Sequence, residues 1–256
     1  MLRSSAASRA AAVTWQSIAN AALAALLAPT CATCDGLLAR PLDGAVCPAC
    51  WTRLPRFTPP VCAICGWPLP AGPDRDRSRT TCHRCGVHLP GVAAARAVGP
   101  FEGQMVEIVH ALKYARRPSV SGPLSTLMRH AAADLLAGVD LVVPVPLHPR
   151  RERERGFNQA EALARGLGPP VCRALRRPRI ATPQAALSGR ARRENVRQAF
   201  AVGPEAGRVT GRVVALVDDV LTTGATLGAC AAALAAAGPI RIVAVTAARV
   251  DRPPSG

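Results

Sequence analysis

The chain has 256 residues, of which 49% are hydrophobic, so it can bury one good-sized core and a smaller module, and disorder throughout is excluded. Its formal net charge of +16 indicates anionic partners, such as phosphates, nucleic acid or a membrane surface, without selecting one of them. The charge is uneven, because residues 145–200 hold thirteen Arg and four Glu, a net charge of +9, and we expect an anion to bind there.

An N-terminal helix is expected within residues 1–29. The alanine-rich stretch 10–28 is interrupted by four polar residues, Thr14, Gln16, Ser17 and Asn20. A membrane-spanning helix needs about 20 mainly apolar residues, which this stretch does not provide. No small-x-small cleavage site lies cleanly before Cys31, so a secretory signal is not expected either. The features predict an amphipathic helix, no stable membrane insertion and a cytoplasmic protein, whose thiols stay reduced.

Residues 30–90 are dominated by cysteine. Eight of the ten cysteines form four C-x-x-C pairs, namely Cys31/Cys34, Cys47/Cys50, Cys62/Cys65 and Cys82/Cys85. Two thiolates on one tight turn can bind the same tetrahedral Zn²⁺, and two such turns complete a Cys₄ shell. Gaps of 12 and 16 residues within the two sequential sets are close to usual ribbon spacing. We therefore predict a double zinc ribbon in which the first two pairs hold one zinc and the last two pairs hold the other.

Two other uses of these cysteines are a disulfide scaffold and redox chemistry. A reducing compartment disfavours a disulfide scaffold, and thioredoxin-like redox chemistry needs one C-x-x-C at a helix start rather than four in series. A Cys₄ shell leaves no open coordination position, so both zincs are expected to be structural. Cys172 and Cys230 lie in apolar sequence and are predicted to be small buried hydrophobes.

Residues 91–256 are predicted to form an α/β domain. The expected strands are residues 95–101, 139–145, 171–175, 212–217 and 240–247, and the expected helices are residues 104–114, 123–136, 159–167 and 223–237. Residues 176–198 are rich in arginine and lack periodicity. Strands that alternate with helices of this length imply right-handed crossovers and a mainly parallel sheet flanked by helices.

The segment Val213–Leu227, VVALVDDVLTTGATL, has the features of a sugar-phosphate site. Its apolar run predicts a strand buried on both faces, with Asp218 and Asp219 at the carboxyl end, where open α/β sheets bind ligands. Ribose hydroxyls are donors suited to these carboxylates. The following loop into a helix, residues 222–226, brings backbone N–H groups and three hydroxyls together as a monophosphate cradle. A plain strand-turn-helix with Thr capping explains the loop alone, but not the aspartates.

These residues carry a resemblance to a known family. Val213–Leu227 resembles the signature of type I phosphoribosyltransferases that binds phosphoribosyl pyrophosphate (PRPP). The wider chain is similar to the ComF family, proteins associated with DNA uptake in naturally competent bacteria, in its cysteine pairs, His110–Tyr114, Val143–Ala160 and Thr182–Phe200. The resemblance implies a type I phosphoribosyltransferase fold after the zinc ribbons.

The resemblance also implies roles for individual residues. Asp218 and Asp219 would bind the ribose hydroxyls. The 5′-phosphate would lie against Thr222, Thr223, Gly224, Ala225 and Thr226. The pyrophosphate and its Mg²⁺ would lie at the loop that contains Pro146 and His148 and leads into Arg150 and Arg151. A loop around residues 188–197 would close over the site, with Arg192 and Arg193 as catalytic candidates that shield the leaving charge.

Two functions of different classes remain open from the sequence. One is Mg²⁺-dependent transfer of a phosphoribosyl group to an unidentified acceptor, for which no base-reading segment is evident. The other is a non-enzymatic or PRPP-regulated DNA-uptake protein that binds PRPP or a nucleotide, single-stranded DNA or protein partners of the competence machinery. The role of Lys113 also stays open. It is the one Lys among 32 Lys and Arg residues, and the sequence fits either a functional ammonium or a solvated helix end.

Overall fold

The computed structural model describes residues 14–70, 80–82, 89–114, 117–178 and 199–251, which divide between two compact units, Met1–Thr52 and Arg53–Gly256. The division lies between the second and third cysteine pairs. The predicted boundaries at residues 29 and 90 remain a prediction. No helix in the described ranges is long and apolar enough to cross a membrane.

The first unit contains helices α1 (Trp15–Leu27) and α2 (Pro48–Thr52) and the 3₁₀ helix η1 (Pro41–Asp43). Thr14 caps α1 by accepting from Ser17 N, and the helix ends where Ala28 adopts a left-handed conformation. The helix buries the polar Asn20, whose Oδ1 accepts from Leu42 N at 2.9 Å. It leaves Trp15 85% exposed. An apolar stripe packed on a core is therefore not what holds α1 in place.

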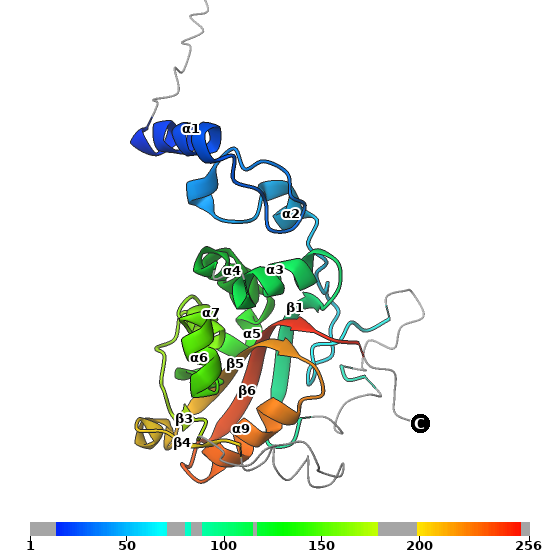
Figure 1. The fold of residues 1–256 in the computed structure, drawn as a ribbon. Coiled ribbons are helices and arrows are strands. Elements are labelled where there is room, and N and C mark those ends of the chain that lie inside the picture. Colours follow the sequence, from blue (N-terminus) through cyan, green and yellow to red (C-terminus); the bar gives the residue numbers. More distant parts are fainter. Residues whose placement is uncertain (1–13, 71–79, 83–88, 115–116, 179–198, 252–256) are drawn as a thin grey trace, which may run out of the picture. The chain divides into compact units, whose positions relative to one another are not determined.

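The second unit is built on a parallel sheet of four strands (Figure 1). The strands are β1 (Ala94–Pro100), β2 (Leu141–Pro144), β5 (Val213–Leu221) and β6 (Arg241–Arg249), in the order β1-β6-β5-β2. All neighbours are parallel. Central strands of such a sheet are covered on both faces, so they need the continuous apolar runs that the sequence provides.

Helices flank the sheet, as the ribbon in Figure 1 shows. The element bounds are α3 (Gln104–Lys113), α4 (Ser121–Ala131), α5 (Ala133–Leu136), α6 (Pro149–Arg155), α7 (Gln159–Ala164) and α9 (Ala225–Ala235), with 3₁₀ helices η2 (Pro118–Val120) and η3 (Ala206–Val209). Helix α9 packs in one core cluster with alternate residues of the strands, among them Val143, Leu216 and Ala244. The alternating neighbours Val142 and Ala215 are buried as well. Period-two alternation thus supplies both faces of the sheet with apolar side chains.

Several elements differ from the sequence expectation. The predicted helix 123–136 is divided into α4 and α5 at Ala132, where φ is −113° and ψ is 17°. The predicted strand 171–175 is reduced to a bridge at Val171 and the short strand β3 (Leu175–Arg176), which pairs antiparallel with β4 (Ala201–Val202). The fourth predicted strand, residues 212–217, extends further, because β5 continues through the aspartates to Leu221.

The segment that contains the third cysteine pair covers the edge strand β1. Phe57 N donates to Val98 O at 2.8 Å, and Ala95 N donates to Ile64 O at 2.7 Å. Gly99 lies so close to the same segment that an added Cβ would be 2.1 Å from Pro55 O. An exposed edge strand is a template for unwanted strand pairing, and this segment satisfies its backbone groups instead.

Candidate functional site

Asp218 and Asp219 lie in the last part of β5, at the carboxyl-terminal edge of the sheet. Each carboxylate is fixed by the backbone that follows it: Asp218 Oδ1 accepts from Asp219 N and Asp219 Oδ1 accepts from Val220 N, both at 2.9 Å. Asp219 is buried and Asp218 half-buried. Burial raises the pKa of Asp218 well above its ordinary value of 3.8, and the Asp219 charge raises it further. The pair therefore favours partners that donate hydrogen bonds or carry positive charge.

Lys113, at the end of α3, supplies such a charge. Its Nζ lies 2.7 Å from Asp219 Oδ2, and the two side chains are 20% and 6% exposed. A lysine whose ammonium is paired with a buried carboxylate is not a freely solvated helix end. A buried carboxylate without a partner would be costly, and Lys113 supplies that partner.

The turn after β5 brings residues 222–226 into the first turn of α9. Gly224 is the residue before the helix, with a φ of 78° that glycine adopts without strain. Thr223 Oγ1 accepts from Ala225 N at 3.1 Å, which is the capping contact that the plain strand-turn-helix alternative requires. Thr222 and Ala225 are exposed and Thr226 is half-buried, so the predicted phosphate cradle is accessible from outside.

The loop after β2 lies next to β5, because Val145 N donates to Val217 O at 2.9 Å. Pro146 and His148 are half-buried in this loop, and Arg150 and Arg151 are exposed on α6. His148 caps α6, since its Nδ1 accepts from Arg150 N at 3.2 Å. The predicted pyrophosphate residues thus follow one strand and the aspartates lie in its neighbour.

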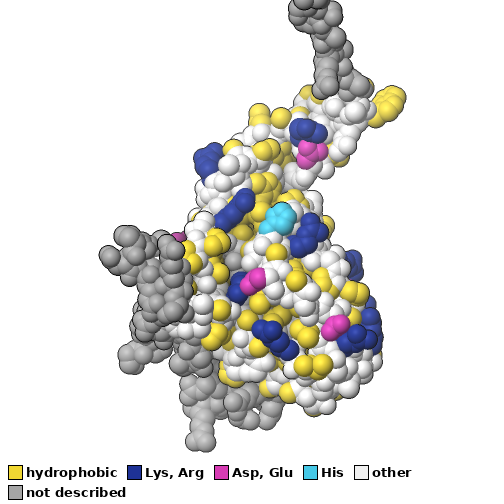
Figure 2. All heavy atoms as spheres, turned by 180° about the vertical axis from the view of Figure 1, so that it is seen from behind, with side chains coloured by type: hydrophobic (Ala, Val, Ile, Leu, Met, Phe, Trp, Pro, Cys, Tyr) yellow, Lys and Arg dark blue, Asp and Glu magenta, His cyan; other side chains and the backbone are white. Residues whose placement is uncertain are grey.

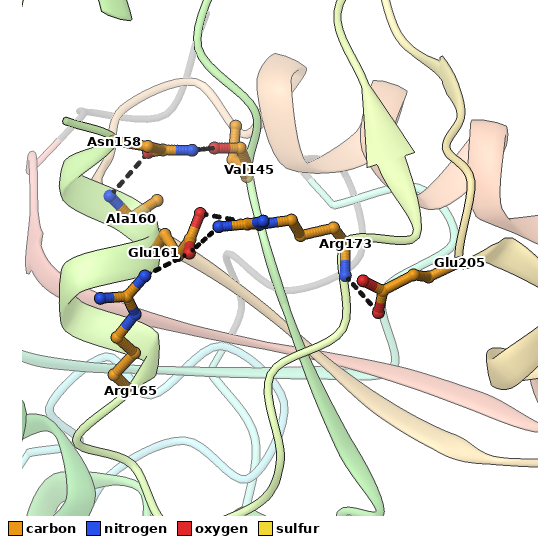
Figure 3. A network of polar contacts seen from close by, with 7 residues as sticks. All are labelled: Val145, Asn158, Ala160, Glu161, Arg165, Arg173 and Glu205. Carbon is orange, nitrogen blue, oxygen red and sulfur yellow. Dashed lines mark hydrogen bonds and ion pairs between the residues drawn. The ribbon is translucent and has the colours of Figure 1, made fainter. Parts of the chain in front are cut away.

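A polar network joins the loop after β2 to helix α7 (Figure 3). Asn158 donates to Val145 O at 3.0 Å and accepts from Ala160 N at the start of α7. One turn on, Glu161 pairs with both Arg165 and Arg173. Burial alone would raise the pKa of Glu161, but these two guanidinium groups lower it below its ordinary value. The network keeps α7 in register with the loop and with Arg173.

The first two cysteine pairs form one cluster in the first unit. The sulfurs of Cys31, Cys34, Cys47 and Cys50 all lie within 4.8 Å of one another. The Cys34 and Cys47 sulfurs are 3.9 Å apart, close to the edge of about 3.8 Å that a tetrahedron with Zn–S bonds of about 2.3 Å requires. Cys47 N donates to Cys31 Sγ at 3.3 Å, a contact that favours the thiolate. The donor set fits a closed zinc site.

The third pair meets Cys82 of the fourth pair in the second unit. The sulfurs of Cys62, Cys65 and Cys82 lie within 4.8 Å of one another, and those of Cys65 and Cys82 are 3.5 Å apart. Two backbone N–H groups, of Cys65 and Cys82, donate to Cys62 Sγ at 3.4 Å. Cys85, predicted as the fourth ligand, lies outside the described residues. The three described sulfurs fit three of the four ligand positions of a tetrahedral zinc site.

The sequence and the cysteine clusters agree with known proteins. A family model for a double zinc ribbon domain matches residues 22–86. The DNA utilization protein YhgH of Escherichia coli O6:H1 is 33% identical over 192 residues, which cover 71% of this chain and 80% of the relative. The chain belongs to the ComF family. Competence protein F of Haemophilus influenzae is 28% identical over 77% of this chain and 86% of its own, and ComFC of Bacillus subtilis is 26% identical over 72% and 75%.

Among solved structures, the allosteric regulatory enzyme of purine biosynthesis matches 54% of this ComF-family chain and 29% of its own chain, with 22% identity and a TM-score of 0.37. A score this low carries no argument. The predicted ComF membership is confirmed by the relatives, and the predicted α/β fold with a parallel sheet flanked by helices is confirmed by the strand order and pairing. The cysteine-rich zinc ribbon module before it is confirmed by the family model and the cysteine clusters.

The sequence left the role of Lys113 open, and it did not indicate Arg177 at all. In this ComF protein Arg177 is half-buried, with its guanidinium 5.2 Å from the centre of the Phe200 ring. Burial lowers the pKa of Arg177, the neighbouring charge of Arg151 lowers it further, and Asp218 acts in the opposite direction. The catalytic candidates Arg192 and Arg193 lie outside the described residues. Nothing in the arginine-rich sequence distinguishes Arg177 from its neighbours.

Proposed function

We propose that this ComF-family chain binds PRPP at the carboxyl ends of β2 and β5 and transfers its phosphoribosyl group to an acceptor in a Mg²⁺-dependent reaction. The observation that carries the proposal is the pair Asp218 and Asp219, held by the backbone at the sheet edge, with the turn of residues 222–226 directly after it. Two ribose hydroxyls could donate to the carboxylates while the 5′-phosphate lies against residues 222–226.

The proposed transfer is a substitution at C1′ of the ribose. The bond from C1′ to the pyrophosphate oxygen breaks, and the pyrophosphate leaves with the electron pair. A nitrogen of the acceptor forms the new bond to C1′ and then loses its proton to solvent. Charge at the leaving pyrophosphate would be neutralised by Arg150 and Arg151, with Arg192 and Arg193 as further candidates.

Mg²⁺ would lower the charge of the leaving pyrophosphate when bound. In the described part of the chain, groups of three or more potential metal ligands are formed by cysteines alone. The metal would therefore arrive bound to the phosphates of PRPP, which is the usual way that Mg²⁺ enters phosphate sites.

The test is calorimetric titration of the zinc-loaded full chain with PRPP and Mg²⁺, followed by pyrophosphate release with a panel of bases and amines. The double variant Asp218→Asn/Asp219→Asn should lose PRPP binding. Asp43→Asn, which removes one exposed carboxylate from the first unit, should bind as the wild type does. Absence of PRPP binding by the wild type would refute the proposal. Binding of PRPP without release of pyrophosphate in the presence of any acceptor would leave only a PRPP-binding protein.

A second function, binding of single-stranded DNA, is favoured by one observation. Arg150, Arg151 and Arg153 are exposed on α6. Arg155 of the same helix lies 5.2 Å over the ring of Tyr114, which is 69% exposed. Exposed aromatic rings beside arginines can stack bases and contact phosphates. On the face seen in Figure 2, by contrast, the Lys and Arg side chains of the described residues are scattered among apolar ones rather than gathered in one patch.

DNA binding makes predictions that differ from those of PRPP binding. The logarithm of the affinity for an oligonucleotide should fall steeply with the logarithm of the salt concentration. Arg151→Ala with Arg153→Ala should weaken that binding, whereas the double aspartate variant should leave it nearly unchanged. The names DNA utilization protein and competence protein, borne by the relatives, are consistent with this second function.

A further inference from the structure

A pocket of about 260 Å³ is lined by Lys113, Tyr114, Arg151, Glu154 and Arg155. Three of these five side chains carry positive charge and one carries negative charge. The walls come from the end of α3 and from α6, two elements that are distant in sequence. A hollow with a net positive lining attracts a compact anion more strongly than a neutral or cationic group.

Lys113 lies between this pocket and Asp219. Its ammonium is 2.7 Å from Asp219 Oδ2 and also forms part of the pocket wall. An ammonium has three N–H donors, and within the described ranges Nζ is paired with Asp219. The remaining donors can reach an anion in the pocket without release of the carboxylate. One side chain can thus connect the carboxylate to whatever fills the pocket.

The choice of lysine at this position has a physical reason. Arginine is the basic residue nearly everywhere else in the chain. A guanidinium presents its donors in one plane and binds one carboxylate or phosphate in a fork, whereas an ammonium directs three donors to separate acceptors. Contact with Asp219 on one side and an anion on the other therefore suits lysine better than arginine.

We propose that Lys113 is a positioning residue that joins Asp219 to a diphosphate bound in the pocket of Lys113, Tyr114, Arg151, Glu154 and Arg155. The inference rests on the proposed function, because the diphosphate is the pyrophosphate end of PRPP and Asp219 faces its ribose. Lys113 holds both ends of the ligand in one geometry, so its contribution depends on the diphosphate being present. A purely structural partner of Asp219 would act on all ligands alike.

The experiment titrates PRPP, inorganic pyrophosphate and ribose 5-phosphate, each with Mg²⁺, into zinc-loaded wild type, Lys113→Met and Lys113→Arg. Loss of a charge-assisted hydrogen bond should lower the affinity of Lys113→Met for PRPP and for pyrophosphate by about tenfold or more. Ribose 5-phosphate affinity should change by less than about threefold. Lys113→Arg should fail to restore the affinity for PRPP. Arg208→Met, which removes an exposed and remote charge, is the matched control and should bind like the wild type.

The outcomes separate this inference from the proposed function. If the wild type binds PRPP and Lys113→Met binds it within about twofold, the inference is wrong and the function stands. If the wild type does not bind PRPP, the function fails, and the pyrophosphate titration alone decides the role of Lys113. An oligonucleotide that Lys113→Met binds more weakly, and that pyrophosphate does not displace, would assign the pocket to nucleic acid and overturn the inference.

Lys113→Met leaves Asp219 without its counter-charge and can unfold for that reason. A second comparison avoids this difficulty: Asp219→Asn is titrated with pyrophosphate beside the double variant Lys113→Met/Asp219→Asn. Neither variant has a buried, unpaired carboxylate at residue 219. The double variant should still bind pyrophosphate about tenfold more weakly than Asp219→Asn alone, and equal affinities would refute a contact between Lys113 and the diphosphate.

Discussion

Replacing Arg96 by Met tests how firmly the turn of the third cysteine pair, the Cys62–Cys65 knuckle, is joined to the sheet. Arg96 lies on the edge strand β1 and is 7% exposed. Its Nη1 donates to the carbonyl oxygens of Ala95, Ala63 and Cys62 at 2.8, 3.1 and 3.4 Å. Its Nη2 is paired with Asp134 at 2.6 Å. One buried guanidinium therefore joins the knuckle backbone, the strand and α5.

The expected loss in the free energy of unfolding follows from these contacts. Hydrogen bonds from a charged donor contribute about 1.5–3 kcal/mol each when well formed, but the bond to Cys62 is long and the three carbonyls share one nitrogen. The pair with Asp134, which is 56% exposed, adds at most about 1 kcal/mol. Met keeps much of the apolar stem, so a large cavity is not created. We expect a loss of about 3 kcal/mol, which corresponds to a fall in Tm of roughly 6–12 °C.

The measurement is urea unfolding of the zinc-saturated chain, followed by a signal from the second unit. Asp134→Asn isolates the surface ion pair and should cost less than about 1 kcal/mol. Arg208→Met controls for the loss of one positive charge and should be near neutral. A loss below about 1 kcal/mol for Arg96→Met would show that the knuckle does not depend on this side chain and that the reasoning from its contacts is wrong.

Three further predictions concern other parts of the molecule. Cys34→Ser should lower the bound zinc by one equivalent per chain, measured by a chelator assay, without shifting the unfolding of the second unit, since Cys34 belongs to the first. Gly99→Ala should destabilise the second unit by about 1–3 kcal/mol in denaturant, because its Cβ would meet Pro55 O. The folded-state pKa of Asp218 is raised, so its contribution to stability is full below the ordinary value near 3.8 and is lost as pH rises through the folded pKa. Asp218→Asn should remove that part of the decline in a series of unfolding curves against pH, and an unchanged decline would assign it to other groups.

The strands that carry the site could be predicted from the sequence. A strand covered on both faces needs an unbroken apolar run, and β5 begins with Val213, Val214 and Ala215 in such a run. Asp218 and Asp219 stand out because charge at this position is costly without a partner. Local composition is sufficient for these conclusions, since each depends on neighbours in the chain.

Helix α6 is absent from the helices expected from the sequence. Its sequence PRRERER has no apolar periodicity, because the helix is largely exposed and buries no face. Its signals are local: Pro149 at the first position, His148 as cap, and an Arg150–Glu154 pair one turn apart at 2.8 Å. A search for hydrophobic periodicity cannot detect such a helix, whereas a search for caps and spaced charges can.

The partners of the aspartates could not be predicted, and the reason lies in the geometry of a strand. Consecutive residues of a strand direct their side chains to opposite faces of the sheet. Asp219 accordingly meets Lys113 of α3, whereas Asp218 acts on Cys230 of α9, whose pKa is raised by burial and by that carboxylate, and on Arg177. The order of the residues in the sequence gives no sign of which cation will face which carboxylate.

This separation bears on how a ligand can use the two residues. Asp219 is buried and already balanced by Lys113, while Asp218 is half-buried and its charged form is disfavoured. A ligand that donates hydrogen bonds to both must therefore meet one carboxylate with a fixed counter-charge and one without. Asp218 gains more from a new donor, because an unbalanced charge is stabilised most by each added hydrogen bond. Asp218→Asn alone should accordingly weaken PRPP binding more than it weakens pyrophosphate binding, whereas loss of Lys113 should weaken both.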